Sequence, residues 1–595
     1  MPFRKVMVAN RGEIAIRIFR TLREMGIPSV GVYSEVDRDA LFVSHADEAY
    51  LLGPGPAAES YLNVPRILEV AAQAGVEAVH PGYGFLAENA GFARALAQAG
   101  IVWIGPPPGA IDAMGSKVRS RALMDAAGVP IVPGVTEAVA DVEAARPIAD
   151  AIGYPVAVKA SAGGGGKGFR VALDAEELEG AFLGASGEGQ RFFADGEVYL
   201  ERYLPNPRHV EIQILADSHG SCVWLGERDC SVQRRHQKLI EETPSPVVSD
   251  DLRARMGDAS VRAAGAVGYT SAGTLEYLVS GDEFFFLEMN TRIQVEHTIT
   301  EAVTGYDLVR EQIRVAAGEP LSMTQDDVRP RGHAFECRIN AEDASARFMP
   351  SPALITAYRE PSGPGVRVDS GVRAGSVIAE IYDPMVAKLI VWDVDRESAR
   401  RRMIRALDEY VVEGPATLIP FHRWLFENEE FIAGGACHSL LAGLAETATP
   451  IPASGSGTLA PTAADTAGDE PPQAERRFVA EVDGRRFEVA LRYDAAAGAA
   501  GGGGAPVPAR APKAKRRSEK GGAGAPGQVV TPMQGTVLKV LVEVGQELRA
   551  GDVVCIVEAM KMENEIATHD AGTVVELRVS EGQGVDIGEL LAVVG

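Results

Sequence analysis

The C-terminal part of the chain contains an internal repeat that restricts its fold more than any other feature. Residues 535–554, "GTVLKVLVEVGQELRAGDVV", return in outline as residues 572–591, "GTVVELRVSEGQGVDIGELL", at a constant offset of 37 residues. Each copy has short runs rich in Val and Leu that are interrupted by Gly, which is typical of short strands and tight turns. The repeat therefore predicts a small, quasi-two-fold, all-β domain over 528–595.

A single lysine lies between the two copies. Lys561 stands between two methionines in "VEAMKMENEI", residues 557–566, close to the midpoint of the repeat. An isolated lysine at a hairpin tip usually only faces solvent, but a projecting amine on the connecting turn can also be acylated. The "AMKM" motif resembles that of biotinyl carrier domains, and this resemblance implies covalent biotin on Lys561. Lipoyl domains share the fold but typically carry an acidic residue before the lysine, so the methionines favour biotin.

The length and composition indicate several soluble domains. A chain of 595 residues is too long for one core, and no apolar run approaches the roughly 18 residues that span a bilayer. The N-terminus lacks the pattern of a secretory signal, and five scattered cysteines form no CxxC pair, so we expect a cytoplasmic protein with reduced thiols. A net charge of -24 argues against nucleic acid or an anionic membrane as a partner.

Two stretches of linker composition divide the C-terminal half. Residues 446–475 and 494–527 are rich in Ala, Gly and Pro, and the second also contains the basic run "ARAPKAKRRSEK". Such a composition cannot bury enough apolar surface to fold, so a flexible tether is favoured over a nucleic-acid tail. Between them, residues 476–493 alternate apolar and polar side chains around an Asp483-Gly484 turn, which predicts a β-hairpin that packs on another domain or subunit.

The N-terminus predicts a βαβ unit. An apolar strand, "KVMVA", precedes an amphipathic helix, "RGEIAIRIFRTLREM", and a second strand, "PSVGVY". A dinucleotide site requires G-x-G-x-x-G at the first turn, and only Gly12 is present, so NAD and FAD are excluded. The glycine-rich segment "KASAGGGGKGF", 159–169, also fails the P-loop pattern because Gly168 follows Lys167. Its backbone amides could still approach an anion closely, although a flexible hairpin tip remains an alternative.

The segment "FLEMNTRIQVEH", 286–297, has polar residues of one parity. If the chain is extended there, Glu288, Asn290, Arg292, Gln294 and Glu296 point to one side of the sheet. A polar strand face can serve solubility alone, but five residues of both charge signs favour a lined cleft. Glu276 in "GTLEYLV" is expected on a neighbouring strand, where carboxylate and amide oxygens suit Mg²⁺.

Taken together, residues 1–445 resemble the ATP-grasp fold of biotin carboxylases. The resemblance implies a multidomain α/β chain with an N-terminal Rossmann-like layer (1–114), an ATP-grasp domain (115–330) and a C-terminal α+β domain (331–445), followed by linkers and a biotinyl hammerhead domain. It implies that ATP contacts Lys117, Lys159, Gly164, Gly165, Gly166, Glu201, Arg202, Leu204, His209, Gln233 and His236. Arg202 stands where a lysine is expected. Magnesium or manganese would be held by Glu276, Glu288 and Asn290.

The resemblance also implies the chemistry. Glu296 would act as general base on bicarbonate, which Arg292, Gln294 and the Val295 backbone would bind. Lys238 would neutralise the phosphoryl group during formation of carboxyphosphate, and Arg338 would stabilise the biotin enolate.

No segment remains for a carboxyltransferase. We therefore expect the α subunit of an acyl-CoA carboxylase for acetyl- or propionyl-CoA, with a separate carboxyltransferase (β) subunit, a biotin protein ligase and a homo-oligomeric carboxylase part. The alternatives are a subunit of a keto-acid carboxylase such as pyruvate carboxylase, and a non-enzymatic biotin carrier.

Overall fold

The structure of the chain, a computed structural model, describes most of the sequence. The described residues are 3–135, 137–161, 168–193, 196–234, 237–437, 440–441, 473–482, 485–494, 527–531, 535–559, 562–585 and 588–595. Most of the two predicted linkers therefore lies outside the described residues, as do the predicted site residues Gly164, Gly165, Gly166, His236 and Lys561.

A five-stranded parallel sheet forms the first layer, as the N-terminal pattern predicts, with the order β3-β2-β1-β4-β5. Its elements are β1 (Val6–Val8), α1 (Gly12–Glu24), β2 (Ser29–Ser34), β3 (Glu48–Gly53), α2 (Val64–Ala74), β4 (Ala78–His80), α3 (Ala90–Gln98), β5 (Val102–Trp103) and α4 (Pro108–Gly115). Val6 and Val8 pack with α1, whereas Met7 between them packs with α2 and α3. Helices thus cover both faces, which is the doubly wound arrangement.

Local signals set the ends of α2. The Asn63 side chain accepts a hydrogen bond from the N–H of Arg66 at 3.1 Å, and Pro65 occupies the first turn, where a missing N–H costs nothing. Gly75 ends the helix with φ at +63°, a left-handed conformation that favours glycine.

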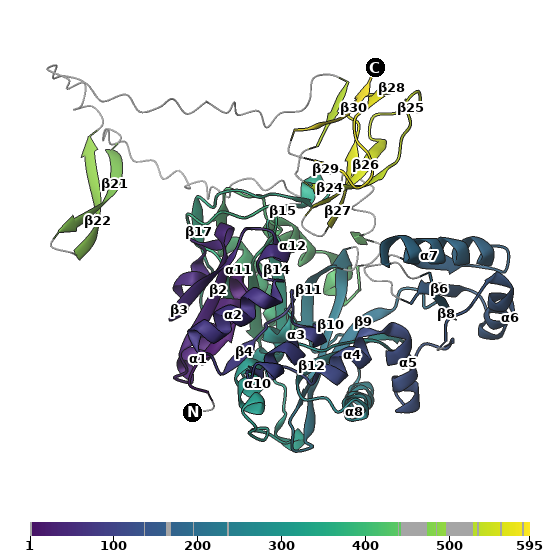
Figure 1. The fold of residues 1–595 in the computed structure, drawn as a ribbon, viewed down its shortest axis with the longest axis horizontal. Coiled ribbons are helices and arrows are strands. Elements are labelled where there is room, and N and C mark those ends of the chain that lie inside the picture. The colour runs from purple at the N-terminus through teal and green to yellow at the C-terminus, as the bar shows by residue number, and fades with distance from the viewer. Residues whose placement is uncertain are drawn as a thin grey trace. The chain divides into compact units, whose positions relative to one another are not determined.

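A small three-stranded sheet with the order β7-β6-β8 follows in the chain. Its elements are α5 (Lys117–Ala126), α6 (Val142–Ile152), β6 (Val156–Ala160), β7 (Phe169–Ala172), α7 (Leu178–Phe193) and β8 (Val198–Arg202). Val156 and Val158 of β6 pack with Ala181 and Ala185 of α7 in a separate apolar cluster. This part therefore has a core of its own and stands at one side of the larger sheet (Figure 1).

An eight-stranded antiparallel sheet forms the centre, in the order β13-β12-β9-β10-β11-β14-β19-β18. Its strands are β9 (Arg208–Ala216), β10 (Cys222–Arg234), β11 (Gln237–Thr243), β12 (Ser271–Ser280), β13 (Glu283–Asn290), β14 (His333–Asn340), β18 (Val366–Ser370) and β19 (Met385–Asp393). Because β11 pairs with β14, the sheet runs without interruption from the segment before residue 330 into the segment after it.

Helices and short strands complete this central part. They are α8 (Asp250–Ala266), α9 (His297–Thr304), α10 (Leu308–Ala316), β15 (Glu342–Asp343), β16 (Met349–Pro350), β17 (Ala357–Arg359), α11 (Arg396–Glu409), β20 (Val411–Glu413), α12 (Ile419–Leu425) and α13 (Glu429–Ile432). Met403 and Leu407 of α11 pack with Phe335 and Leu389 on one face of the sheet. The apolar face is thus filled, and the other side chains of these strands are free to build a polar site.

The predicted hairpin is present. β21 (Gln473–Val482) and β22 (Arg485–Asp494) pair in antiparallel register from Gln473↔Asp494 to Val482↔Arg485, which leaves two residues for the connection. This pair belongs to a compact unit of its own. Two apolar residues of the alternating pattern, Phe478 and Val489, lie opposite each other in the register.

The C-terminal domain has the two-fold organisation that the repeat predicts. Its strands are β23 (Gln528–Val530), β24 (Gly535–Val540), β25 (Glu547–Leu548), β26 (Val553–Ala559), β27 (Met562–Ala567), β28 (Gly572–Leu577), β29 (Gly584–Val585) and β30 (Leu590–Val594). Two four-stranded sheets form, β23-β30-β28-β25 and β27-β26-β24-β29. The offset of the repeat converts β24, β25 and β26 into β28, β29 and β30, so each sheet is the counterpart of the other.

The strands on either side of Lys561 in the sequence are described. β26 and β27 pair as far as Ala559↔Met562. Lys561 itself lies outside the described residues, between these two strands in the sequence. Within the described part of the chain, no helix has both the length and the apolar character needed to cross a membrane. All five cysteines are free thiols.

Candidate active site

A row of charged side chains runs across four neighbouring strands of the eight-stranded sheet. Glu276 of β12 lies opposite Glu288 of β13 on one side and Glu211 of β9 on the other, and Glu211 lies opposite Arg228 of β10. Residues that face each other across antiparallel strands point to the same side of a sheet. The register therefore gathers three carboxylates on one face, where they require cations between them.

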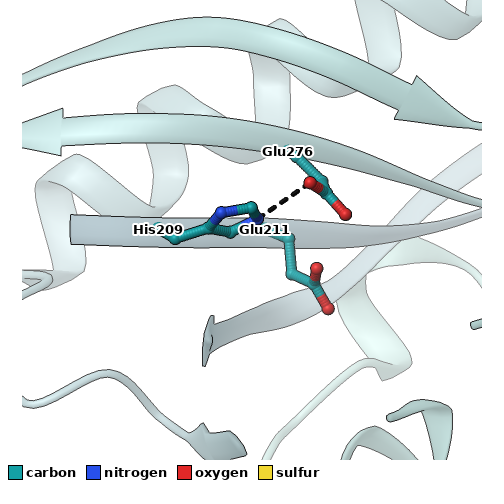
Figure 2. Close-up of side chains that lie close together, drawn as sticks. All are labelled: His209, Glu211 and Glu276. Carbon is teal, nitrogen blue, oxygen red and sulfur yellow. Dashed lines mark ion pairs between the residues drawn. The ribbon is translucent and has the colours of Figure 1, made fainter. Parts of the chain in front are cut away.

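His209 lies beside this row, two residues before Glu211 on β9 (Figure 2). Its Nε2 is 2.8 Å from Oε2 of Glu276, the ion pair drawn in Figure 2. Burial acts to lower the pKa of His209, but the charge of Glu276 outweighs burial and the pKa is raised. His209, which was expected at the nucleotide, thus pairs with Glu276, which was expected to bind magnesium.

Lys238 of β11 joins the carboxylates to one another. Its Nζ donates to Glu211 at 2.5 Å, to Glu276 at 3.0 Å and to Glu296 at 2.6 Å. Burial acts to lower the pKa of Lys238, but the surrounding anionic groups raise it well above its ordinary value. This ammonium group is therefore a permanent positive charge at the centre of the cluster.

Glu296 is held between two cations at the start of α9. Its Oε1 accepts from Lys238, and its Oε2 accepts from Nη2 of Arg338 at 2.9 Å. Burial would raise the pKa of Glu296, but Lys238, Arg338 and Arg228 outweigh it and hold the pKa well below its usual range. The carboxylate is therefore ionised, and both of its oxygens are held by cations.

Arg338 of β14 contacts a second carboxyl group. Its Nε donates to Oε1 of Glu241 at 2.7 Å. Burial raises the pKa of Glu241 to about 8, and burial also raises the pKa of Glu336, which lies opposite Glu241 in the register, to about 7. Arg338 therefore lies between one ionised carboxylate and two carboxyl groups that keep protons near neutral pH.

Arg228 supports the cluster from beneath and is completely buried. Its guanidinium group donates to Glu211 at 2.6 Å, Gln213 at 2.7 Å, Gln294 at 2.6 Å, Thr300 at 3.0 Å and Thr274 at 3.1 Å. One planar cation with five donors thus connects β9, β12, α9 and the turn before α9.

The turn after β13 brings together the polar residues of one parity, although not as the extended chain that we expected. β13 ends at Asn290, whose Nδ2 donates to Oε1 of Glu276 at 2.8 Å, as does Nε2 of Gln294. Arg292 lies nearer the surface and donates to Oδ1 of Asn290 at 2.9 Å and to Glu88 at 3.2 Å. The main chain leaves the sheet after Asn290, and the side chains of Asn290 and Gln294 bond inward to the cluster.

The residues expected at the ATP phosphates lie at the edge of this cluster. Burial lowers the pKa of Lys117, the first residue of α5, against the opposing charge of Glu288. Lys159 of β6 forms an ion pair with Glu201 of β8, and the second oxygen of Glu201 accepts from Arg121 at 2.9 Å. The Glu201 carboxylate is thus occupied by protein cations, which leaves its backbone as the group able to meet a base.

Other residues expected at the nucleotide lie farther along the same side. The Arg202 guanidinium carbon is 5.1 Å from the ring centre of Phe285, and Leu204 is buried against the same ring and Val132. Gln233 lies opposite Lys238 in the β10–β11 register and donates to the Cys230 carbonyl at 2.8 Å. The Phe285 ring thus gives this region an apolar surface, against which an aromatic ligand could pack.

Two residues of the cluster, Glu211 and Arg228, were absent from the sequence-based prediction. The strand "RHVEIQILA" places His209, Glu211 and Gln213 at alternate positions, which is the same signal that identified Glu276 and its neighbours. Arg228 gave no such signal, because a β-bulge between Trp224 and Glu227 breaks the alternation of β10.

The predicted magnesium ligands fit a divalent cation. Burial and the charge of Glu276 raise the pKa of Glu288, so a buried and a partly buried carboxyl group face each other without full compensation. A hard cation with oxygen ligands would remove that repulsion. Ligand atoms of His209, Glu211 and Glu276 also lie within 4.8 Å of one another, so Glu276 belongs to both candidate ligand sets.

The site as a whole can bind anions between fixed cations and pass a proton to a buried carboxylate. A small sheet that carries Lys159 stands beside a larger sheet that carries the acidic cluster, with a nucleotide-fold layer before both. This combination of fold and site defines an ATP-grasp enzyme.

Comparison with known families supports this class. Residues 2–111 match the biotin carboxylase N-terminal domain, 116–324 the ATP-binding domain of the carbamoyl-phosphate synthase L chain, 336–442 the biotin carboxylase C-terminal domain, and 527–594 the biotin-requiring enzyme family. The biotin carboxylase of Campylobacter jejuni, solved with an ATP analogue, superposes with a TM-score of 0.71 at 44% identity and covers 74% of this chain and 98% of its own.

Two relatives show how far the similarity extends. A biotin-dependent acyl-coenzyme A carboxylase alpha3 subunit from Mycobacterium leprae is 46% identical over 592 residues, which is 99% of this chain and 98% of that protein. A pyruvate carboxylase subunit from Methanothermobacter thermautotrophicus is 55% identical over 432 residues, or 73% of this chain and 88% of that protein. The chain belongs to the biotin carboxylase family, and it also carries a region that matches the biotin-requiring enzyme family. Its reaction is ATP-dependent carboxylation of biotin, with Mg²⁺ as cofactor.

Proposed function

We propose that the chain is the α subunit of an acyl-CoA carboxylase and carboxylates biotin on Lys561, with a separate carboxyltransferase (β) subunit transferring the carboxyl group to acetyl- or propionyl-CoA. The full-length similarity to an acyl-CoA carboxylase α subunit supports this proposal, as does a propionyl-CoA carboxylase alpha chain from Ruegeria pomeroyi that is 38% identical and covers 99% of this chain. Each of those two relatives spans both the carboxylase and the carrier regions.

Glu296 is the proposed base for bicarbonate. Bicarbonate is a poor electrophile and must be activated by ATP before a weak ureido nucleophile can attack it. The single observation that carries this assignment is the ionised Glu296 carboxylate, held at 2.6 Å from Lys238 and 2.9 Å from Arg338. Arg292, Gln294 and the Val295 backbone lie on the same turn and would fix the bicarbonate anion against this base.

Lys238 and the acidic row are proposed to stabilise the charges that develop during phosphoryl transfer. Magnesium, bound through Glu276, Glu288 and Asn290, would neutralise charge on the phosphates of ATP. Lys238, which already bridges Glu276 and Glu296, then lies between the nucleotide and bicarbonate. Formation of carboxyphosphate in this position depends mainly on placement and charge.

The remaining predicted residues complete the two binding sites. Arg338, which contacts Glu296, would hold the ureido oxygen of biotin near the site where carbon dioxide is released. The proposed ATP contacts are Lys117, Lys159, Gly164, Gly165, Gly166, Glu201, Arg202, Leu204, His209, Gln233 and His236. The proposed domain limits are 1–114, 115–330 and 331–445 for the carboxylase and 528–595 for the carrier.

The direct test is Glu296→Gln in the full-length protein. We expect bicarbonate-dependent ADP release with free biotin to fall by at least about 100-fold, because the amide cannot accept the proton. ATP binding should persist, since Lys117 and Lys159 are untouched. Glu319→Gln, at an exposed carboxylate that pairs with Arg314, is the matched control. Turnover retained by the Glu296 variant would exclude this residue as the base.

A keto-acid carboxylase is the second candidate. The higher identity to a pyruvate carboxylase subunit, 55% over 73% of the chain, favours it within the carboxylase region. Purification of the complex with its carboxyltransferase, followed by transfer of labelled carboxyl to acetyl-CoA, propionyl-CoA or pyruvate, separates the two. Labelled pyruvate product without labelled acyl-CoA would overturn the first proposal.

Further partners follow from the same proposal. A biotin protein ligase would modify Lys561, and the carboxylase part would form a homo-oligomer within the larger complex, as in a solved biotin carboxylase domain dimer that is 46% identical. The five free thiols agree with a reducing compartment such as the cytoplasm.

A further inference from the structure

Lys388 is a completely buried lysine to which the proposed reaction assigns no role. It lies on β19 directly opposite Arg338 on β14, and its side chain has 0% exposure. A buried ammonium group is costly unless hydrogen bonds and charges compensate it. The groups that surround Lys388 therefore indicate what this charge stabilises.

The contacts of Lys388 join two distant segments. Its Nζ donates to the carbonyl oxygen of Val295 at 2.7 Å, and Oε2 of Glu13 on α1 lies 3.6 Å away. The contact with the backbone is thus shorter than the contact with the carboxylate. The Val295 carbonyl belongs to the peptide group that leads into Glu296, so the lysine holds the main chain at the proposed base.

The two neighbouring strands hold different parts of the same residue. Arg338 binds the Glu296 carboxylate at 2.9 Å, while Lys388 holds the peptide that precedes Glu296. The turn between Asn290 and α9 pairs with no strand, so it has no ladder to fix it. A shift of about 1 Å in a catalytic group can cost on the order of 100-fold in rate.

We propose that Lys388 is a positioning residue for bicarbonate activation, acting on Glu296 through the Val295 carbonyl. This inference rests on the proposed function, in which Glu296 is the base. The competing explanation is that Lys388 only neutralises Glu13, whose other oxygen accepts a hydrogen bond from Tyr83.

A double variant separates these explanations, because Lys388→Met alone would leave Glu13 buried beside an apolar chain. In Glu13→Gln with Lys388→Met, the Glu13 carboxylate is removed together with its cation, and the glutamine can still accept from Tyr83. If Lys388 positions the base, the double variant keeps its melting temperature but loses at least about 10-fold in kcat with respect to bicarbonate, whereas the KM for ATP changes by less than about 3-fold. If Lys388 only neutralises Glu13, the double variant regains full activity, and the inference is overturned.

Two further variants and a check that the double variant folds make every result decisive. Lys5→Met is the matched control, since Lys5 also bridges a carboxylate, Glu48 at 2.6 Å, and a backbone carbonyl, Ala74 at 3.0 Å, but away from the site; it should retain wild-type turnover. A double variant that fails to fold would show that Lys388 is needed for folding itself, which also contradicts a positioning role. Glu296→Gln, measured in parallel, identifies failure of the proposed function separately, because its retained turnover would remove the base that Lys388 is meant to position.

Discussion

Glu276 and Glu288 face each other in register across β12 and β13, and the charge of Glu276 raises the pKa of Glu288 after burial has already done so. Carboxylates that face each other in this way, one buried and one partly buried, destabilise the protein when both are ionised. They also form a site that gains free energy when a divalent cation binds between them.

Glu288→Gln should therefore have opposite effects with and without metal. In EDTA we expect a higher melting temperature than wild type, because one of the two like charges is gone. With ADP and Mg²⁺ we expect the ligand-induced rise in melting temperature to shrink, corresponding to at least about 10-fold weaker binding. Scanning fluorimetry in both buffers measures this. Asp282→Asn, at an exposed aspartate paired with Arg255, is the control, and an unchanged Mg²⁺ response in the Glu288 variant would contradict the ligand assignment.

Arg228 should matter most for stability. Arg228→Met removes five donors from the buried cluster and leaves Glu211 short of a partner, so we expect a loss of about 3–5 kcal/mol of unfolding free energy. Arg255→Met removes an exposed guanidinium paired with Asp251 and Asp282 and should cost no more than about 1 kcal/mol. Calorimetry of the full chain would compare the two variants. Equal losses of unfolding free energy would mean that the buried contacts of Arg228 contribute no more to stability than an exposed ion pair.

The raised pKa of Glu241 should make the stability of the protein depend on pH. Its folded pKa of about 8 lies above the ordinary value of 4.5, so the folded protein retains a proton that the unfolded chain releases. The resulting stabilisation is complete below about pH 4.5 and is lost as the pH rises through about 8. Glutamine imitates the protonated carboxyl group, so Glu241→Gln should lose less stability than wild type between pH 6 and pH 9.

Glu397→Gln provides the control for this measurement. Hydrogen bonds from Arg400 lower the pKa of the exposed Glu397 carboxylate to about 2, so its contribution does not change between pH 6 and pH 9. Its melting curves at the two pH values should therefore stay parallel to wild type. The same parallel behaviour in the Glu241 variant would show that Glu241 is ionised throughout this range.

Lys561→Arg should separate the two half-reactions. Carboxylation of free biotin should stay within about 2-fold of wild type, because the acidic cluster is unaltered, while mass spectrometry should find no attached biotin and acyl-CoA carboxylation should be lost. Lys539→Arg is the control, since Lys539 is the other lysine of residues 528–595 and is exposed on β24. Biotin found on the Lys561 variant would place the modification elsewhere.

The sequence predicted those parts of the fold in which the spacing of apolar residues or of repeats matches the spacing of the strands. The offset repeat predicted a quasi-two-fold β domain, and the alternation around Asp483-Gly484 predicted a hairpin over 476–493, where the structure pairs Gln473–Val482 with Arg485–Asp494. The parity of residues 288–296 brought side chains of one site together although β13 ends at Asn290: Glu288 faces Glu276 in the register, and Asn290 and Gln294 donate to Glu276.

Other features depend on distant segments and left no local pattern. Arg228 follows a β-bulge, so its side chain cannot be assigned to a face by counting residues. Lys388 occurs singly in an apolar strand, "MVAKLIVWD", where it could equally face solvent at a sheet edge. Only the pairing of β14 with β19 and the approach of the turn before α9 show that this lysine is buried beside Val295.

The carrier domain has one more property that follows from its strand order. β25 of the first copy pairs with β28 of the second, and β29 of the second pairs with β24 of the first. Neither half can therefore complete its own sheet. Cutting the chain between the two copies would therefore leave both sheets without a strand, so the two halves of this domain should unfold together as one cooperative unit.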